Sequence, residues 1–67
     1  MIEIRINGEL RPFDSAPTVS DILTSLDLVG KRIAVERNGS IVPKSQHGTT
    51  LCAANDSIEI VVAVGGG

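Results

Sequence analysis

Aromatic residues are almost absent from this 67-residue chain, which contains one Phe, Phe13, and neither Trp nor Tyr. The core must therefore be aliphatic, with Ile, Val and Leu doing the packing. The chain also has no stacking platform and no basic stripe for nucleic acid. Six Lys and Arg residues against eight Asp and Glu residues give a net charge of −2. We therefore expect no nucleic-acid partner.

Cysteine and long apolar runs are scarce as well. A single cysteine, Cys52, excludes an internal disulfide framework. No apolar run approaches the length of a membrane helix. Residues 1–4 are too short and too charged a start for a signal peptide. Together these absences predict a cytoplasmic protein without a membrane partner.

No residue pattern indicates catalysis or a bound cofactor. The glycines form neither a GxGxxG nor a P-loop motif, so we expect the chain to bind no ATP by itself. The one histidine, His47, lies in a polar segment without metal-ligand spacing, and we expect its side chain to be exposed. We interpret Cys52 as a small hydrophobic residue, and a persulfide acceptor is the alternative. We thus expect no catalytic residues and no metal site.

The first part of the chain predicts a hairpin. Ile alternates with charged residues over residues 2–6, which is typical of a strand with one buried face. Asn7-Gly8 then predicts a type I′ turn, because both central positions of that turn need a positive φ. We expect Leu10 and Phe13 to anchor the returning strand. Its proline cannot donate to a ladder, so this strand belongs at a sheet edge.

One amphipathic helix follows the hairpin. Thr18 and Asp21 form a pair that resembles a capping box. Apolar residues then recur at i, i+3, i+4 and i+7 from Val19, which gives the helix one apolar face. Gly30 is the predicted C′ residue, because glycine accepts the positive φ found there. The helix is expected over about residues 19–28.

The second half of the chain predicts more strands. Asn38-Gly39 repeats the hairpin signal after a strand at residues 33–37. A polar, irregular stretch follows, with Leu51 as its expected anchor into the core. Asn55-Asp56 should turn the chain into the last strand, residues 57–64. A single amphipathic helix must cover one sheet face, so we expect a two-layer α+β domain of four or five strands.

The last strand presents apolar residues on both of its faces. Its expected core face comprises Ile58, Ile60, Val62 and Val64. Val61 and Ala63 then point outward, where polar residues are more common. This pair indicates a partner-binding surface, and a strand that is merely rich in β-formers is the alternative.

The chain ends in three glycines directly after this strand. Glycine has no Cβ, so residues 65–67 can lie flat in a narrow slot. At about 3.3–3.6 Å per residue, the terminal carboxylate reaches roughly 10 Å beyond the domain. We divide the chain into a domain over residues 1–64 and a flexible tail over residues 65–67. The first hypothesis is that the Gly67 carboxylate is the functional group, and an inert frayed end is the alternative.

Six segments spread over the whole chain share one resemblance. They are IRINGE at residues 4–9, TVSDIL at 18–23, AVERNG at 34–39, VPKSQ at 42–46, DSIEIV at 56–61 and AVGGG at 63–67. Together they resemble the ThiS family, the small sulfur carrier proteins of bacterial thiamine biosynthesis. The ending is the most specific segment. The resemblance implies a ubiquitin-like β-grasp fold, a mixed sheet packed on one helix, with the first and last strands parallel and central.

The resemblance also implies how the tail works. In that scheme an E1-like adenylating enzyme uses ATP to activate the carboxylate of Gly67, which follows Gly66. Sulfur supplied by a cysteine desulfurase then makes a thiocarboxylate, which donates its sulfur to thiazole synthase. Gly65, Val61 and Ala63 would contact these partners. The chain itself would be a carrier, not an enzyme, and a monomer when free.

Three other functions remain open at this point. The nearest is a sulfur carrier of the molybdopterin synthase type, which the lack of proline over residues 60–64 disfavours. The second is a ubiquitin-like modifier that is joined to lysines. The third is a binding module whose tail is inert.

Overall fold

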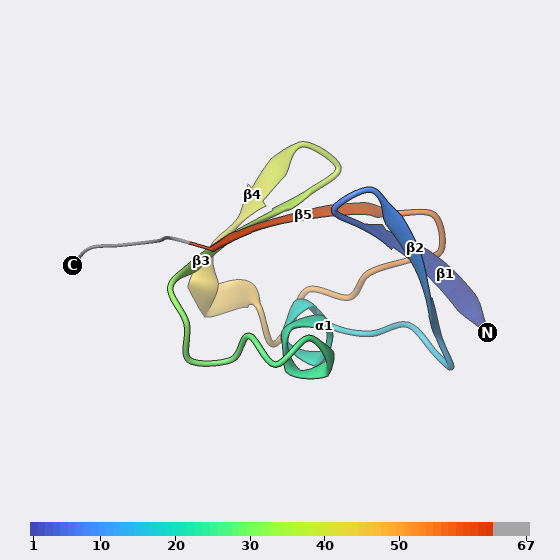
Figure 1. Ribbon diagram of the computed structural model, residues 1–67, viewed down its shortest axis with the longest axis horizontal. Coiled ribbons are helices and arrows are strands. Elements are labelled where there is room, and N and C mark those ends of the chain that lie inside the picture. Colours follow the sequence, from blue (N-terminus) through green and yellow to red (C-terminus); the bar gives the residue numbers. More distant parts are fainter. Residues whose placement is uncertain (63–67) are drawn as a thin grey trace.

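A computed structural model describes residues 1–62. Over that range the elements are β1 (Ile2–Ile6), β2 (Glu9–Phe13), α1 (Val19–Ser25), β3 (Ile33–Arg37), β4 (Ser40–Val42), the 3-10 helix η1 (Lys44–Gln46) and β5 (Ser57–Val62). The strands form one layer, and α1 lies against one side of it (Figure 1). This is the two-layer α+β arrangement that the sequence predicts.

The sheet has the order β2-β1-β5-β3-β4, so the last strand is central. β5 runs parallel to β1, with Ser57 and Ile58 as its residues in register. It runs antiparallel to β3 over residues 58–62. In Figure 1 β5 extends beyond β1 toward the end of the described chain. The implied arrangement, with the first and last strands parallel and central, is confirmed.

Both Asn-Gly pairs form the predicted turns. φ is 50° at Asn7 and 87° at Gly8, and the second pair has nearly the same values. Positive φ at both central positions defines a type I′ turn. β2 is an edge strand, as its proline indicates. Phe13 packs against the core, but the prediction for Leu10 was wrong, because half of this residue is exposed on the outer face beside Arg5.

The helix begins as the sequence predicts. The Thr18 hydroxyl accepts a hydrogen bond from the Asp21 backbone at 3.0 Å, and the Asp21 carboxylate accepts one from the Thr18 backbone at 3.0 Å. These two bonds complete a capping box and satisfy two backbone donors that no helical partner can reach.

The helix ends earlier than predicted, at Ser25. The C′ residue is Asp27, with φ 59°, and not Gly30, which has φ 87° in the following loop. The Asp27 N–H donates to the Thr24 carbonyl, and the Leu28 N–H donates to the Leu23 carbonyl at 2.8 Å. These bonds form a Schellman motif, whose apolar contact draws Leu28 toward the core.

The core is aliphatic apart from one cysteine. Its buried members are Ile4, Ile6, Val19, Ile22, Leu23, Val35, Val42, Cys52, Ile58 and Ile60. The prediction that Leu51 anchors its segment was wrong: Leu51 is 60% exposed and Cys52 is buried. Leu51 forms a bridge with Thr18, and the Cys52 N–H donates to the Pro17 carbonyl. Extended backbone alternates its side chains, so only one of the two neighbours can face inward.

Candidate functional site

The outward face of β5 carries the one predicted site residue that the structure describes. Val61 is 62% exposed and lies opposite Ala34 of β3, while Ile60 on the other face is buried. The outward orientation of Val61 is therefore confirmed. The predicted site residues Ala63, Gly65, Gly66 and Gly67 lie outside the described residues, as does the predicted core residue Val64.

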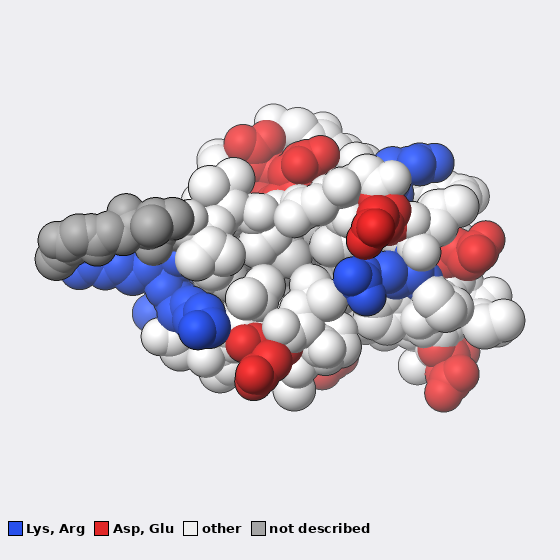
Figure 2. All heavy atoms as spheres, viewed as in Figure 1, with Lys and Arg blue, Asp and Glu red and all other residues white. Residues whose placement is uncertain are grey.

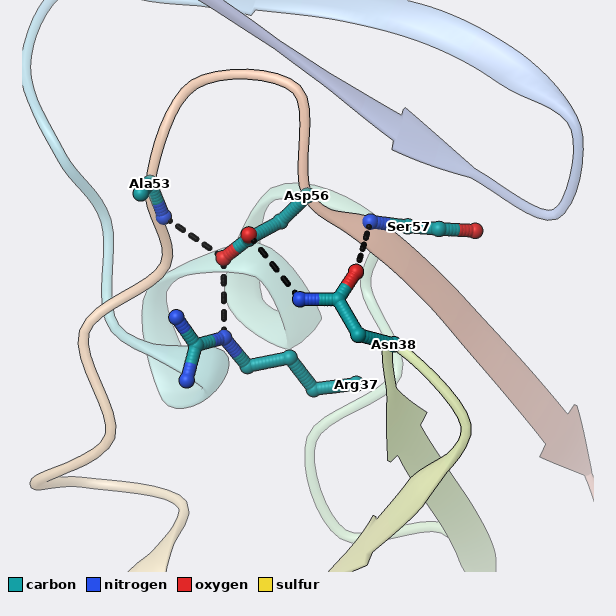
Figure 3. A network of polar contacts seen from close by, with 5 residues as sticks. All are labelled: Arg37, Asn38, Ala53, Asp56 and Ser57. Carbon is teal, nitrogen blue, oxygen red and sulfur yellow. Dashed lines mark hydrogen bonds and ion pairs between the residues drawn. The ribbon is translucent and has the colours of Figure 1, made fainter.

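The start of β5 is fixed by a polar network around a buried carboxylate (Figure 3). The Arg37 Nε donates to one Asp56 oxygen at 2.8 Å, and the Ala53 N–H donates to the same oxygen at 2.8 Å. The Asn38 amide donates to the other oxygen at 3.1 Å and accepts from the Ser57 N–H at 2.9 Å. The network joins the loop before β5 to the β3–β4 hairpin.

This network controls the charge of Asp56. Burial alone would raise the pKa of its carboxyl, but the Ala53 N–H, Arg37 and Asn38 together outweigh burial and hold that pKa below its usual value. The hydrogen bond to Asp56 raises the pKa of Arg37 in turn. Sequence reasoning identified Asp56 only as a turn residue. Its partner Arg37 lies 19 residues away, and no local pattern joins the two.

The structure also places the two residues considered for other chemistry. Burial, with the nearby Asp56 carboxylate, raises the pKa of the Cys52 thiol, which disfavours the reactive thiolate. The expectation for His47 was wrong, because only 8% of this residue is exposed. The turn η1 carries His47 back toward β4, where its Nε2 lies 3.1 Å from the Val42 carbonyl oxygen. That polar partner permits the ring to be buried.

Residues 1–62 contain no cluster of three or more His, Cys, Asp or Glu side chains that could hold a metal ion. In the same range, neither helix has the length and apolar character needed to cross a membrane.

Comparison with known proteins adds an independent line of argument. A sequence model described as the ThiS family matches residues 4–67. The chain belongs to the ThiS family. It is 42% identical over 65 residues to the sulfur carrier protein ThiS of Bacillus subtilis (strain 168), covering 96% of this chain and 98% of that protein.

Two other relatives are longer proteins. The chain is 41% identical over 66 residues to a thiazole synthase of Paramagnetospirillum magneticum and 32% identical over 66 residues to one of Magnetococcus marinus. It is covered to 98% in both comparisons but spans only 20% of each thiazole synthase.

A solved structure confirms the fold. The crystal structure of a thiamine biosynthesis protein (ThiS) from Geobacter metallireducens matches with a TM-score of 0.82 at 23% identity. The match covers 98% of this chain and 100% of that one. Both the predicted β-grasp fold and the resemblance to the ThiS family are thus confirmed.

Proposed function

We propose that this chain is a sulfur carrier of thiamine biosynthesis, and that the Gly67 carboxylate carries the sulfur as a thiocarboxylate. The observation that carries this proposal is the extent of the family match, which runs through residue 67 and so includes the glycines. The relative from Bacillus subtilis, which this chain matches over nearly its whole length, is named a sulfur carrier.

The chemistry explains why a carrier needs an activating partner. A carboxylate is a poor electrophile, because it is negatively charged and has no good leaving group. In the proposed reaction a Gly67 oxygen attacks the α-phosphorus of ATP and pyrophosphate leaves. The terminal sulfur of a persulfide on the cysteine desulfurase then attacks the acyl carbon, AMP leaves and an acyl disulfide forms. A thiol such as free cysteine attacks the desulfurase sulfur of that disulfide, forms a new disulfide with it and releases the thiocarboxylate. The adenylating enzyme supplies ATP binding, positioning and electrostatics.

Contacts among the described residues hold β5, the strand that precedes the proposed reactive segment, in place. Residues 58–62 of β5 pair with β3, and the Asp56 network fixes the start of the strand. The position of β5 up to Val62 is therefore fixed within the sheet. We assign the contacts with partner enzymes to Val61, Ala63 and Gly65, because Val61 adds exposed apolar area close in sequence to the glycines.

Thiazole synthase is the proposed acceptor of the sulfur. Two proteins of that name contain a segment homologous to this chain within one fifth of their length. A shared polypeptide would raise the effective concentration of carrier and acceptor. The proposal places all of these steps in the cytoplasm.

Intact mass spectrometry tests the proposal. The protein is weighed before and after incubation with ATP, an adenylating enzyme, a cysteine desulfurase and cysteine. We expect a gain equal to one oxygen replaced by sulfur, located at Gly67 by fragmentation. The starting mass also establishes whether Gly67 is the last residue. An unchanged mass, with enzymes that modify another ThiS carrier, would contradict the proposal.

A variant without Gly67 is the matched control. We expect its melting temperature to be unchanged, because the buried core spans Ile4 to Ile60. The same variant should gain no sulfur. A population of the chain joined to lysines of other proteins would instead favour the modifier.

A further inference from the structure

A cavity of about 540 Å³ lies between the α1–β3 loop, η1 and the end of β5. Its apolar lining includes Leu23, Leu28, Val29 and Ile33, and its cationic lining consists of Lys31, Arg32 and Lys44. We call these seven residues the basic groove. No Asp or Glu lines the cavity, although acidic residues outnumber basic ones in the chain.

Within residues 1–62, the cations of the basic groove have no polar partner, in contrast to the other three Lys and Arg side chains. Arg37 is paired with Asp56, Arg11 is paired with Glu9 at 3.5 Å, and Arg5 donates to the Gly8 carbonyl. Within residues 1–62, the side chains of Lys31, Arg32 and Lys44 form no ion pair or hydrogen bond. The Lys and Arg side chains that have no partner in that range therefore all line one cavity.

The groove lies at the functional end of the molecule. Val61, an exposed residue next to the end of β5, is part of the same cavity lining. Figure 2 shows Lys and Arg side chains gathered at the end of the molecule where β5 ends. The described part of the molecule is thus polarised, because the chain has a net charge of −2 but Lys31, Arg32 and Lys44 line the same cavity as Val61.

This polarity matters for the first proposed reaction. A net anionic carrier must bring its terminal carboxylate to an enzyme loaded with ATP, which is itself polyanionic. Repulsion between like charges slows such an encounter, and cations placed at the leading end favour the productive orientation. The adenylating enzyme is therefore the partner for which charge at this end has most effect.

We propose that the basic groove binds an acidic segment of the adenylating enzyme, with carboxylates on Lys31, Arg32 and Lys44 and an apolar side chain in the cavity. This inference rests on the proposed function. The lining favours a protein segment over a small anion, because Leu23, Leu28, Val29 and Ile33 would gain nothing from phosphate but bury apolar area against a side chain.

Charge reversal in the groove tests the inference. The double variant Lys31→Glu/Arg32→Glu is compared with Arg5→Glu/Arg11→Glu, which changes the net charge equally on β1 and β2, away from the groove. Binding to the adenylating enzyme that thiocarboxylates the wild-type chain is measured at low and physiological salt. We expect the groove variant to raise Kd about tenfold, more at low salt, and the control to stay within about twofold.

The chemistry is followed in the same experiment. Both variants should keep the wild-type melting temperature, since the four replaced side chains are exposed. At saturating concentration the groove variant should still be thiocarboxylated, with a raised KM and little change in kcat. Equal Kd values for the groove variant and the control would overturn the inference.

Two further outcomes separate the possible failures. If the wild-type chain is never thiocarboxylated, the proposed function fails; if it is thiocarboxylated but the groove variant binds as the control does, only the groove inference fails. ATP and inorganic phosphate are also titrated into the carrier alone. Saturable changes in the NMR chemical shifts of Lys31, Arg32 and Lys44 would show that the groove binds a small anion. This result would overturn the assignment of a protein segment.

Discussion

The side-chain amide of Asn7 holds the backbone of Ile60 through two hydrogen bonds. Its Oδ1 accepts from the Ile60 N–H at 2.7 Å, and its Nδ2 donates to the Ile60 carbonyl oxygen at 3.2 Å. The backbone register of β1 with β5 ends at Ile6 and Ile58, where β1 enters its turn. The amide therefore continues the parallel ladder along β5 to the residue that precedes Val61.

Replacing Asn7 by Ala should destabilise the fold through two effects. It removes both hydrogen bonds, worth about 1 kcal/mol each. It also places Ala at φ 50°, a left-handed conformation that Asn adopts more readily than Ala does. Asn55→Ala is the control, because Asn55 also has a positive φ, 71°, and its side chain forms no hydrogen bond within residues 1–62.

Urea unfolding measures this difference. We expect Asn7→Ala to lower the free energy of unfolding by about 1–2 kcal/mol more than Asn55→Ala does. Equal losses would show that the amide bonds to Ile60 contribute nothing and that φ alone explains both variants.

The lowered pKa of Asp56 predicts a dependence of stability on pH. An unfolded aspartate has a pKa of about 3.9, so its carboxylate stabilises the fold fully above that pH. As the pH falls below about 4 and through the lower folded pKa, the stabilisation is lost, because the unfolded state binds the proton more readily.

The variant Asp56→Asn should remove this part of the pH dependence. The Asn side chain has nearly the same shape as Asp but no negative charge to pair with Arg37. We therefore expect the free energy of unfolding at pH 7 to fall by about 1–3 kcal/mol. The unfolding curve between pH 5 and pH 3 should become flatter, on the usual carboxyl range. Asp14→Asn, at an exposed position, is the control and should keep the wild-type slope. A wild-type slope in Asp56→Asn would mean that another carboxyl carries the acid dependence.

Local signals in the sequence predicted those elements whose residues interact with near neighbours. The Asn-Gly pairs need only their own φ angles, and the capping box joins Thr18 and Asp21, which are three positions apart. These features, with strand alternation, led to the correct fold class. The parallel pairing of β1 and β5 came from the resemblance, because periodicity says nothing about which strands are neighbours.

Residues whose environment is set by distant parts of the chain were harder to predict. Asn7 finds its partner 53 residues away and Arg37 finds Asp56 19 residues away. His47 is buried with its Nε2 3.1 Å from the Val42 carbonyl oxygen, and this polar partner permits the burial. The polar sequence around His47 predicted that its side chain is exposed. The polarity of neighbouring residues does not show whether a carbonyl oxygen is available as a partner. The predictions for the glycine tail stay predictions.

The end of α1 offers a stabilising substitution. Asp27 occupies the C′ position with φ 59°, where an L-residue is strained, and its negative charge lies near the negative end of the helix dipole. Asp27→Gly relieves both effects, so we expect a gain of about 1 kcal/mol in the free energy of unfolding.

Asp27→Ala separates charge from backbone strain. It removes the carboxylate but not the penalty at positive φ, so its gain should be clearly smaller than that of Asp27→Gly in thermal unfolding. A Gly variant no more stable than the Ala variant would show that φ strain at this position is negligible.

A substitution at Val61 should affect partner binding much more than it affects stability. Val61→Asp places a charge on a side chain that is 62% exposed, so folding should lose less than about 1 kcal/mol. The same charge would be buried without a partner in any complex that covers the end of β5, which we expect to raise Kd for the adenylating enzyme at least tenfold. Leu10→Asp is the matched control, because Leu10 is 50% exposed but lies on the edge strand β2. If both variants lose affinity equally, added negative charge and not position is responsible. If Val61→Asp keeps the wild-type affinity and stability, the outer face of β5 does not take part in the encounter.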